Sequence, residues 1–519
     1  MTTTSAPTPT RRICFGNDPL TVDDVVAIAH RQATVALSDA PDFRMRIDAG
    51  AQFLDRLLDE DGVVYGVTTG YGDSCTTAVP LDLVPELPHH LVAYHGCGTG
   101  RILTEEETRA VLAARLTSLS LGLSGISYAL LRQLTDLLEH DILPCIPAEG
   151  SVGASGDLTP LSYVAAVLCG ERDVRYRGTV RPTREVFDEC GIAPLRLRPK
   201  EGLAIMNGTA VMTGLACLAW DRAQSLAHMA TLITACNVHI AAGNAHHFDA
   251  GLFDAKPHPG QQRAAKRIRR VLDSPQPARN EARLQDRYSL RCAPHVIGVL
   301  EDASDWARQW IENELDSAND NPLIDPEREC VLHGGHFYGG HIAFAMDGLK
   351  TAVANIADLL DRQLALLVDT RYNHGLPANL SGATGPRAAI NHGLKALQIS
   401  VSAWTAEALK LTMPASVFSR STECHNQDKV SMGTIAARDC LRIVTLTEQV
   451  MAAMLIAVRQ GVPLRTRVDP DGVVPQRIAA FHEALAEVIP FLDEDRALDQ
   501  TLHLLLSELH AQRWSHHAS

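Results

Sequence analysis

The sequence is poor in aromatic residues, in positive charge and in paired cysteine motifs. Phe, Trp and Tyr make up 5% of the 519 residues, and 47 Lys and Arg stand against 61 Asp and Glu, which gives a net charge of −14. This acidic balance disfavours nonspecific binding to nucleic acid or to an anionic membrane surface. The 12 Cys include no CxxC pair, so we expect a reducing compartment and unpaired thiols.

Long apolar runs and targeting signals are also missing. Every candidate run is interrupted before the roughly 18 apolar residues that a membrane-spanning helix needs, and the N-terminus has no charged and then apolar secretory signal. The 22 His show no HExxH or comparable ligand spacing, so no metal is expected. With 46% hydrophobic and 21% charged residues, the chain is predicted to be globular, cytoplasmic and not integral to a membrane.

Helical periodicity dominates what is present. Leu349, Val353, Ile356, Leu360, Leu364 and Leu367 recur at steps of three and four residues, which is the spacing of one helical face. Similar Ala- and Leu-rich stretches occur around 105–139, 203–243, 296–315, 386–412, 434–460 and 476–512. Sequence patterns typical of β-strands are limited to short segments such as 174–180. The pattern predicts a mainly α protein with a core bundle of long helices.

Pro and Gly cluster in three stretches, 62–73, 144–160 and 331–340. We expect irregular loops there, on a helical scaffold that positions functional residues. The chain is divided only roughly, into a loose Thr- and Pro-rich tail (1–11), an N-terminal loop-bearing part (12–200) and a helical body (201–519). The last two are expected to form one cooperative unit.

The most informative loop reads GSVGASGDLTPLS at 150–162. Thr159 as N-cap and Pro160 at the first helical position predict a helix that begins there. Residues 154–156 then lie just before a helix N-terminus, where free N–H groups favour developing negative charge. Taken alone, the run is a capped loop, and it fits a nucleophile elbow poorly because Asp157 stands where a Gly is required.

This run resembles the signature of the aromatic amino acid ammonia-lyases and the related 2,3-aminomutases. In that family an Ala-Ser-Gly tripeptide cyclises with loss of two waters to the electrophile 4-methylideneimidazole-5-one (MIO). The resemblance implies that Ala154, Ser155 and Gly156 form this prosthetic group. The residue types suit the chemistry, because a Gly nitrogen carries no side chain to hinder attack and Ser can dehydrate to a methylidene.

Five further segments resemble family motifs in the family's order. They are YGVTTGYG at 65–72, LAIMNGT at 203–209, YSLRC at 288–292, NDNP at 319–322 and NQDKVSM at 426–432. Each alone is weak, since NDNP is a common turn and Tyr65 a common packed aromatic. Together they extend the resemblance over about residues 60–435. It implies the helical ammonia-lyase fold, with the N-terminal part bearing the MIO group.

The implied reaction removes ammonia from an aromatic L-α-amino acid and gives an α,β-unsaturated acid. A general base contributes ~10²–10⁴-fold, whereas enzymes commonly reach at least ~10⁶-fold. The electrophile at 154–156 would supply the missing activation of the amine. By resemblance, Tyr65 is the base for the β-proton. We expect converging helix N-termini to lower the pKa of its phenol, ordinarily about 10.

The remaining roles also follow from the resemblance. Arg291 would bind the substrate carboxylate, because its planar guanidinium suits a bidentate partner. Asn207 and Tyr288 would position the amine and the electrophile, and Phe337 would pack beside them. The family usually has Asn where this chain has His336.

Two positions bear on the substrate's ring. Tyr94 and His95 stand at the family's selectivity pair, which is Ser-His in histidine, Phe-Leu in phenylalanine and His-Leu in tyrosine enzymes. Histidine ammonia-lyases place Glu where this chain has Gln427, so a histidine substrate would lose its charged partner. We expect His95 to bind a para hydroxyl and Gln427 to line the same site, which favours L-tyrosine giving p-coumarate.

Several alternatives stay open at this level. His95 could be a packed core histidine, and phenylalanine or ring-substituted tyrosines could be the substrate. A tyrosine or phenylalanine 2,3-aminomutase shares the first elimination, and a histidine ammonia-lyase or a non-catalytic helical scaffold are further readings. The resemblance implies a homotetramer with active sites shared between subunits, and no metal or nucleotide cofactor.

Overall fold

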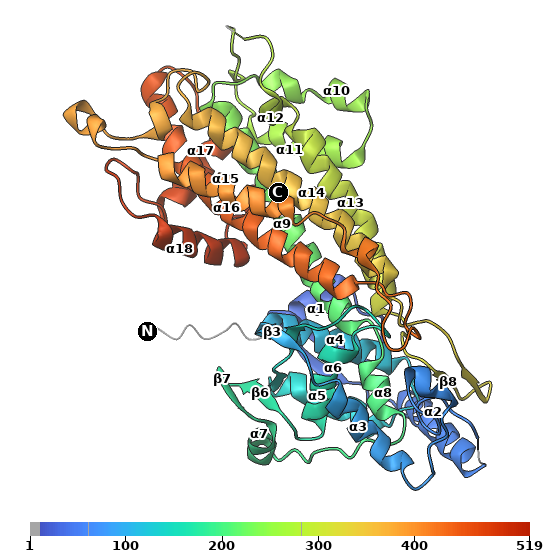
Figure 1. The fold of residues 1–519 in the computed structure, drawn as a ribbon. Helices are drawn as coiled ribbons and strands as arrows, with labels where there is room; N and C mark the ends of the chain where they lie inside the picture. Colours follow the sequence, from blue (N-terminus) through green and yellow to red (C-terminus); the bar gives the residue numbers. More distant parts are fainter. Residues whose placement is uncertain (1–10, 61, 282, 519) are drawn as a thin grey trace. The chain divides into compact units, whose positions relative to one another are not determined.

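The computed structural model describes residues 11–60, 62–281 and 283–518. They are mainly helical, as the sequence predicted (Figure 1). The predicted tail at 1–11 lies outside the described residues except for Arg11, which begins a strand. All 12 cysteines are free thiols.

The chain forms two compact units that are discontinuous in sequence. The first comprises Met1–Asp221, Arg308–Asp347 and Pro414–Arg438, and the second comprises Arg222–Ala307, Gly348–Met413 and Asp439–Ser519. The division near residue 200 stays a prediction, because such discontinuous units do not test a single border.

The first unit holds all the strands that the structure describes. Its helices are α1 (Val22–Ala29), α2 (Pro41–Asp59), α3 (Leu87–Tyr94), α4 (Glu105–Ser120), α5 (Tyr128–Glu139), α6 (Leu158–Leu168), α7 (Thr183–Cys190) and α8 (Glu201–Met206), with 3-10 turns η1 (Gly72–Thr76), η2 (Val84–Glu86) and η6 (Ala415–Phe418). The strands are β1 (Arg11–Phe15), β2 (Ala33–Leu37), β3 (Thr99–Ile102), β4 (Leu143–Pro144), β5 (Pro147–Glu149), β6 (Asp173–Tyr176), β7 (Thr179–Pro182), β8 (Leu323–Asp325) and β9 (Cys330–Leu332).

These strands form four small sheets. β1 and β2 are parallel, whereas β3–β5, β4–β6–β7 and β8–β9 are antiparallel. The strand predicted at 174–180 is a hairpin of β6 and β7 instead. The chain turns there at Arg177 and Gly178, which have φ of 50° and 76°.

Four long helices run from one unit into the other, and the remaining helices belong to the second unit. The four are α9 (Ala210–Ile240), α13 (Ala293–Leu315), α14 (Gly340–Val368) and α16 (Gly433–Val468). The second unit adds α10 (Ala250–Asp254), α11 (Pro259–Val271), α12 (Tyr288–Arg291), α15 (Lys395–Lys410), α17 (Gln476–Ala486), α18 (Asp499–His510) and α19 (Ser515–Ala518), with 3-10 turns η3 (Ala245–Phe248), η4 (Ala378–Leu380) and η5 (Gly385–Ala389).

One described helix, α16, is long and apolar enough to cross a membrane. Its most apolar 18 residues have a mean hydropathy of 1.6, and 83% of that window is buried inside the protein. α16 is therefore a core helix. The face predicted from Leu349 to Leu367 is likewise buried, within α14.

Several predicted helical stretches are broken by glycines. The stretch 105–139 divides into α4 and α5, because Gly122 and Gly125 adopt φ of +82° and +65°. The stretch 203–243 divides at Gly208, which has φ +143°. Such angles are open mainly to glycine, so a helix cannot continue through them.

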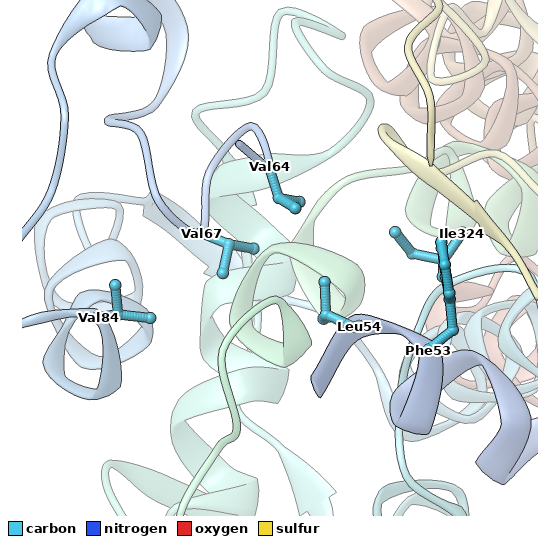
Figure 2. Close-up of a cluster of buried hydrophobic side chains, with 6 residues drawn as sticks. All are labelled: Phe53, Leu54, Val64, Val67, Val84 and Ile324. Atoms are coloured by element: carbon cyan, nitrogen blue, oxygen red, sulfur yellow. The ribbon is translucent and has the colours of Figure 1, made fainter. Parts of the chain in front are cut away.

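The loop that carries Tyr65 is anchored by a small cluster of buried apolar side chains. Val64 and Val67 are buried against Phe53 and Leu54 of α2, Val84 of η2 and Ile324 of β8 (Figure 2). Burying the valines on either side of Tyr65 and Gly66 anchors this turn to the scaffold.

Candidate active site

The loop at 150–157 is organised around the buried carboxylate of Asp157. Its Oδ2 accepts the N–H groups of Val211 (3.0 Å) and Met212 (2.9 Å), the first turn of α9. Its Oδ1 accepts the hydroxyls of Ser151 (3.0 Å) and Thr434 of α16. Because α6 begins at the next residue, three helix N-termini meet at this one side chain.

The same arrangement corrects the predicted helix start. α6 begins at Leu158 with Asp157 at its N-cap, so Thr159 is not the cap and lies in the first turn with Pro160. Asp157 makes no capping bond to α6, because its two oxygens are bound by α9, α16 and Ser151. Burial raises the pKa of Asp157, and these hydrogen bonds oppose that effect.

Glycines let two backbones approach closely at the tripeptide. The Gly208 N–H donates to the Ser155 carbonyl (3.1 Å) and the Asp157 N–H to the Gly208 carbonyl (2.8 Å). A Cβ on Gly156 would stand 2.1 Å from the Gly208 oxygen. Ser155 has φ +49°, which is uncommon for a residue with a side chain and typical of strained functional loops.

The residues present fit the predicted prosthetic group. Among the described residues, neither the Gly156 N–H nor the Ala154 carbonyl takes part in a hydrogen bond, so the two groups that would join are not engaged elsewhere. The Asn207 side-chain carbonyl, one residue before Gly208, is buried without a partner in the described part of the chain. An unpaired buried acceptor of this kind is costly unless a ligand satisfies it.

A cavity of about 320 Å³ opens beside the tripeptide. Three segments line it, with the residues His95, then Gly150, Ser151, Val152, Ala154, Leu158 and Thr159, and then Thr422, Glu423 and Gln427. The structure thus brings together Ala154, His95 and Gln427, three of the predicted site residues. The volume of this cavity is at the lower end of the range for small-molecule sites.

His95, one of the residues that line this cavity, has one unprotonated ring nitrogen. Its Nδ1 lies 3.0 Å from the Leu91 carbonyl, so Nδ1 carries the proton and Nε2 is left as an acceptor. Burial lowers the pKa of His95, against a smaller opposing effect of that carbonyl. The ring of Tyr94 lies 4.4 Å from the His95 ring between centroids, and Tyr94 is 57% exposed.

Tyr65 lies in a network with the turn at η1. The Gly72 N–H donates to its phenol oxygen (2.8 Å). Burial of the ring raises the pKa of Tyr65, Gly72 lowers it, and the charges of Glu423 and Cys75 raise it. The expected lowering of the pKa of Tyr65 is wrong for the described residues, because burial of the ring is the largest effect and raises it.

Phe337 and Gln427 belong to the first unit. Phe337 is half-buried in the loop between β9 and α14, and the Gln427 Oε1 accepts the Thr422 hydroxyl (2.9 Å). Tyr288 and Arg291 belong to the second unit, on α12. There the Arg291 guanidinium lies 4.7 Å from the centre of the Tyr288 ring, and its Nε donates to the Asp286 carbonyl (2.9 Å).

The comparison with known proteins decides the family. The model of the aromatic amino acid lyases matches residues 20–487. The chain belongs to the aromatic amino acid lyase family. As expected from the sequence, its relatives are carbon-nitrogen lyases: it is 35% identical to histidine ammonia-lyase of Shouchella clausii, over 94% of this chain and 95% of that one. It is 37% identical to tyrosine ammonia-lyase of Cereibacter sphaeroides, with the same coverage.

The fold of this lyase is also that of solved relatives. The crystal structure of tyrosine aminomutase from Streptomyces globisporus matches with a TM-score of 0.90 at 33% identity, covering 98% of both chains. The family and the helical ammonia-lyase fold predicted from the motifs are therefore confirmed.

Sequence reasoning assigned no role to two residues of this site. Glu423 lines the cavity and reaches the turn after Tyr65, and Asp157 joins three helices. The signal for Asp157 was its N-cap residue type directly after the tripeptide. No sequence pattern around Glu423 indicates its contact with Asp73, which is 350 residues away.

Proposed function

We propose that this lyase eliminates ammonia from an aromatic L-α-amino acid, with L-tyrosine giving p-coumarate as the reaction. The observation that carries the proposal is the free Nε2 of His95 in the cavity that also contains Ala154. An aromatic substrate whose amine lies at the tripeptide would point its ring into this cavity. A para hydroxyl could then donate to the His95 nitrogen.

Ala154, Ser155 and Gly156 are proposed to form the MIO group. The left-handed Ser155, the close approach of Gly208 and the unengaged Gly156 N–H support this assignment. When present, the group supplies an electrophile that makes the amine a better leaving group. Asn207 would hold the substrate amine through its unpaired side-chain carbonyl.

Tyr65 is proposed as the general base. Its phenolate would take the β-proton, the C–H electron pair would form the new double bond, and the C–N bond would break to release ammonia. The Gly72 N–H stabilises the phenolate form. Arg291 is proposed to bind the substrate carboxylate and Tyr288 to help position the amine and the electrophile. Phe337 is proposed to pack at the site, and Tyr94 and Gln427 to line it.

A second candidate is L-histidine, and a specific observation favours it. This chain has Gln427 where histidine ammonia-lyases have a glutamate, so that carboxylate is missing. Glu423 lines the same cavity, so a charged partner for an imidazole is still present. The expectation that histidine lacks such a partner is therefore weakened. Relatives named for histidine and for tyrosine have similar identity, and the similarity to tyrosine aminomutase keeps β-tyrosine as an alternative product.

Incubation of the purified protein with L-tyrosine, L-phenylalanine and L-histidine, followed by chromatography, tests the proposal. Accumulation of p-coumarate supports it, β-tyrosine moves the assignment to an aminomutase, and urocanate as main product replaces tyrosine by histidine. Ser155→Ala is the matched control and should abolish turnover of whichever substrate reacts. We also propose that the protein is a homotetramer located in the cytoplasm. Size-exclusion chromatography with light scattering tests the homotetramer.

A further inference from the structure

The turn at η1, which follows Tyr65, is bound to side chains outside the turn through the N–H groups of Gly72 and Asp73. None of its residues, Gly72–Thr76, is buried, so it has no apolar anchor. Its ends are closed by the bridge between Thr69 and Ala78 and by the Gly70 N–H to the Thr77 carbonyl (3.0 Å). Within the turn, two successive N–H groups point to side chains from other segments.

These two N–H groups join the base to a distant carboxylate. The Gly72 N–H donates to the Tyr65 phenol oxygen (2.8 Å). The next N–H, that of Asp73, donates to Glu423 Oε1 (2.9 Å) and Oε2 (3.1 Å). The carboxylate lies so close that a Cβ on Gly72 would stand 2.3–2.4 Å from it, and Gly72 has φ +58°.

The segment that presents Glu423 is itself fixed. Thr422 and Gln427 exchange backbone hydrogen bonds (3.0 and 3.2 Å), and the Thr422 hydroxyl binds the Gln427 side chain (2.9 Å). Inside this hairpin Glu423, Cys424 and His425 have φ of 52°, 53° and 66°. Three successive left-handed residues are costly, and the hairpin keeps this conformation only because its ends are pinned.

We propose that Glu423 is a positioning residue: it holds the η1 turn through the Asp73 N–H and thereby keeps the Gly72 N–H on the phenol oxygen of Tyr65. This inference rests on the proposed function of Tyr65 as base. The titratable groups that face Tyr65 are Glu423, Cys75, Tyr71 and Tyr94. Of these, Glu423 is bound to the same turn as the phenol.

Kinetics of three single variants and one double variant test the proposal. Glu423→Ala removes the acceptor and should lower kcat about 10–100-fold with KM changed less than about threefold, since small misplacements of a catalytic group cost up to ~10²-fold. Glu423→Gln still accepts the Asp73 N–H and should keep kcat within about threefold of wild type. Asp73→Pro removes the donor and should match Glu423→Ala, and the double variant should be no worse than either single one.

The matched control is Asp82→Asn, which removes one exposed negative charge of the same unit. An unchanged kcat in Glu423→Ala would overturn the proposal. A Glu423→Gln variant as slow as Glu423→Ala would also overturn it, because the effect would then come from the charge of Glu423. A defect confined to KM would overturn it as well, because the effect would then come from substrate binding.

A readout without substrate separates this proposal from the function. Amide hydrogen exchange of the peptide covering 66–79 should become faster in Glu423→Ala and Asp73→Pro, and not in Glu423→Gln or Asp82→Asn. If wild-type protein converts none of the three amino acids while exchange follows this pattern, the proposed function fails and the positioning role stands. Unchanged exchange in Glu423→Ala overturns the positioning role.

Discussion

Replacing Asp157 should reveal how much of the site depends on one buried carboxylate. In Asp157→Ala, the N–H groups of Val211 and Met212 and the hydroxyls of Ser151 and Thr434 lose their acceptor. An unsatisfied buried polar group costs about 1–3 kcal/mol, so we expect a loss of about 4 kcal/mol or more. Asp157→Asn can keep an oxygen on the two N–H groups and donate to the two hydroxyls, so its loss should stay within about 2 kcal/mol.

Urea unfolding followed by tryptophan fluorescence compares the two variants. Mass spectrometry of the peptide that contains 154–156 reports in parallel whether the two waters are lost. We expect the Ala variant to be the less stable by about 2 kcal/mol and to retain both waters. Equal stability of the two variants, within about 1 kcal/mol, would refute the view that Asp157 acts as the shared acceptor of α9, Thr434 of α16 and Ser151.

Three further outcomes follow from the described contacts. Burial and Glu423 hold the pKa of Tyr65 above its ordinary value of 10, so kcat/KM should rise about tenfold per pH unit from about pH 7.5 to 9.5 as the phenolate forms; a flat profile would exclude Tyr65 as the titrating base. Lys200→Met leaves the Asp320 carboxylate buried without its 2.5 Å partner and should cost about 3–5 kcal/mol in urea unfolding, largely restored by the double variant with Asp320→Leu; a loss below 1 kcal/mol would contradict this. Ser155→Ala should retain wild-type stability within about 1 kcal/mol and the unmodified peptide mass, because Ser155 offers no side-chain hydrogen bond in the described part of the chain; a two-water loss in this variant would exclude Ser155 as the source of the methylidene.

The sequence predicted the helical fold class and part of the cavity lining. Periodic Leu and Ala predicted long helices such as α14 because burial on one face imposes that spacing. The motifs predicted that Ala154, His95 and Gln427 belong to one site, and they line one cavity. Helix breaks at Gly122 and Gly208 were missed, since an isolated glycine inside a helical pattern can be tolerated and does not by itself mark a break.

The electrostatics of the site could not be predicted in the same way. The pKa of Tyr65 depends on Gly72, Cys75 and Glu423, and the last of these is 358 positions away. Sequence separation carries no information on such contacts. Helix N-termini were expected to lower this pKa, but the sequence does not reveal that the ring of Tyr65 is buried enough to raise it.

The burial of Tyr65 explains why the base has to be activated in another way. Burial of its ring holds the pKa of Tyr65 above the ordinary phenol value, so the protein alone leaves the phenol protonated near neutral pH. A substrate whose amine lies at the tripeptide would bring a positive charge to the site, and a positive charge near a phenol lowers its pKa. If the amine binds there, ionisation of Tyr65 is coupled to substrate binding. The phenolate then forms mainly when there is a β-proton to remove, and the apparent pKa seen in kcat lies below the one seen in kcat/KM.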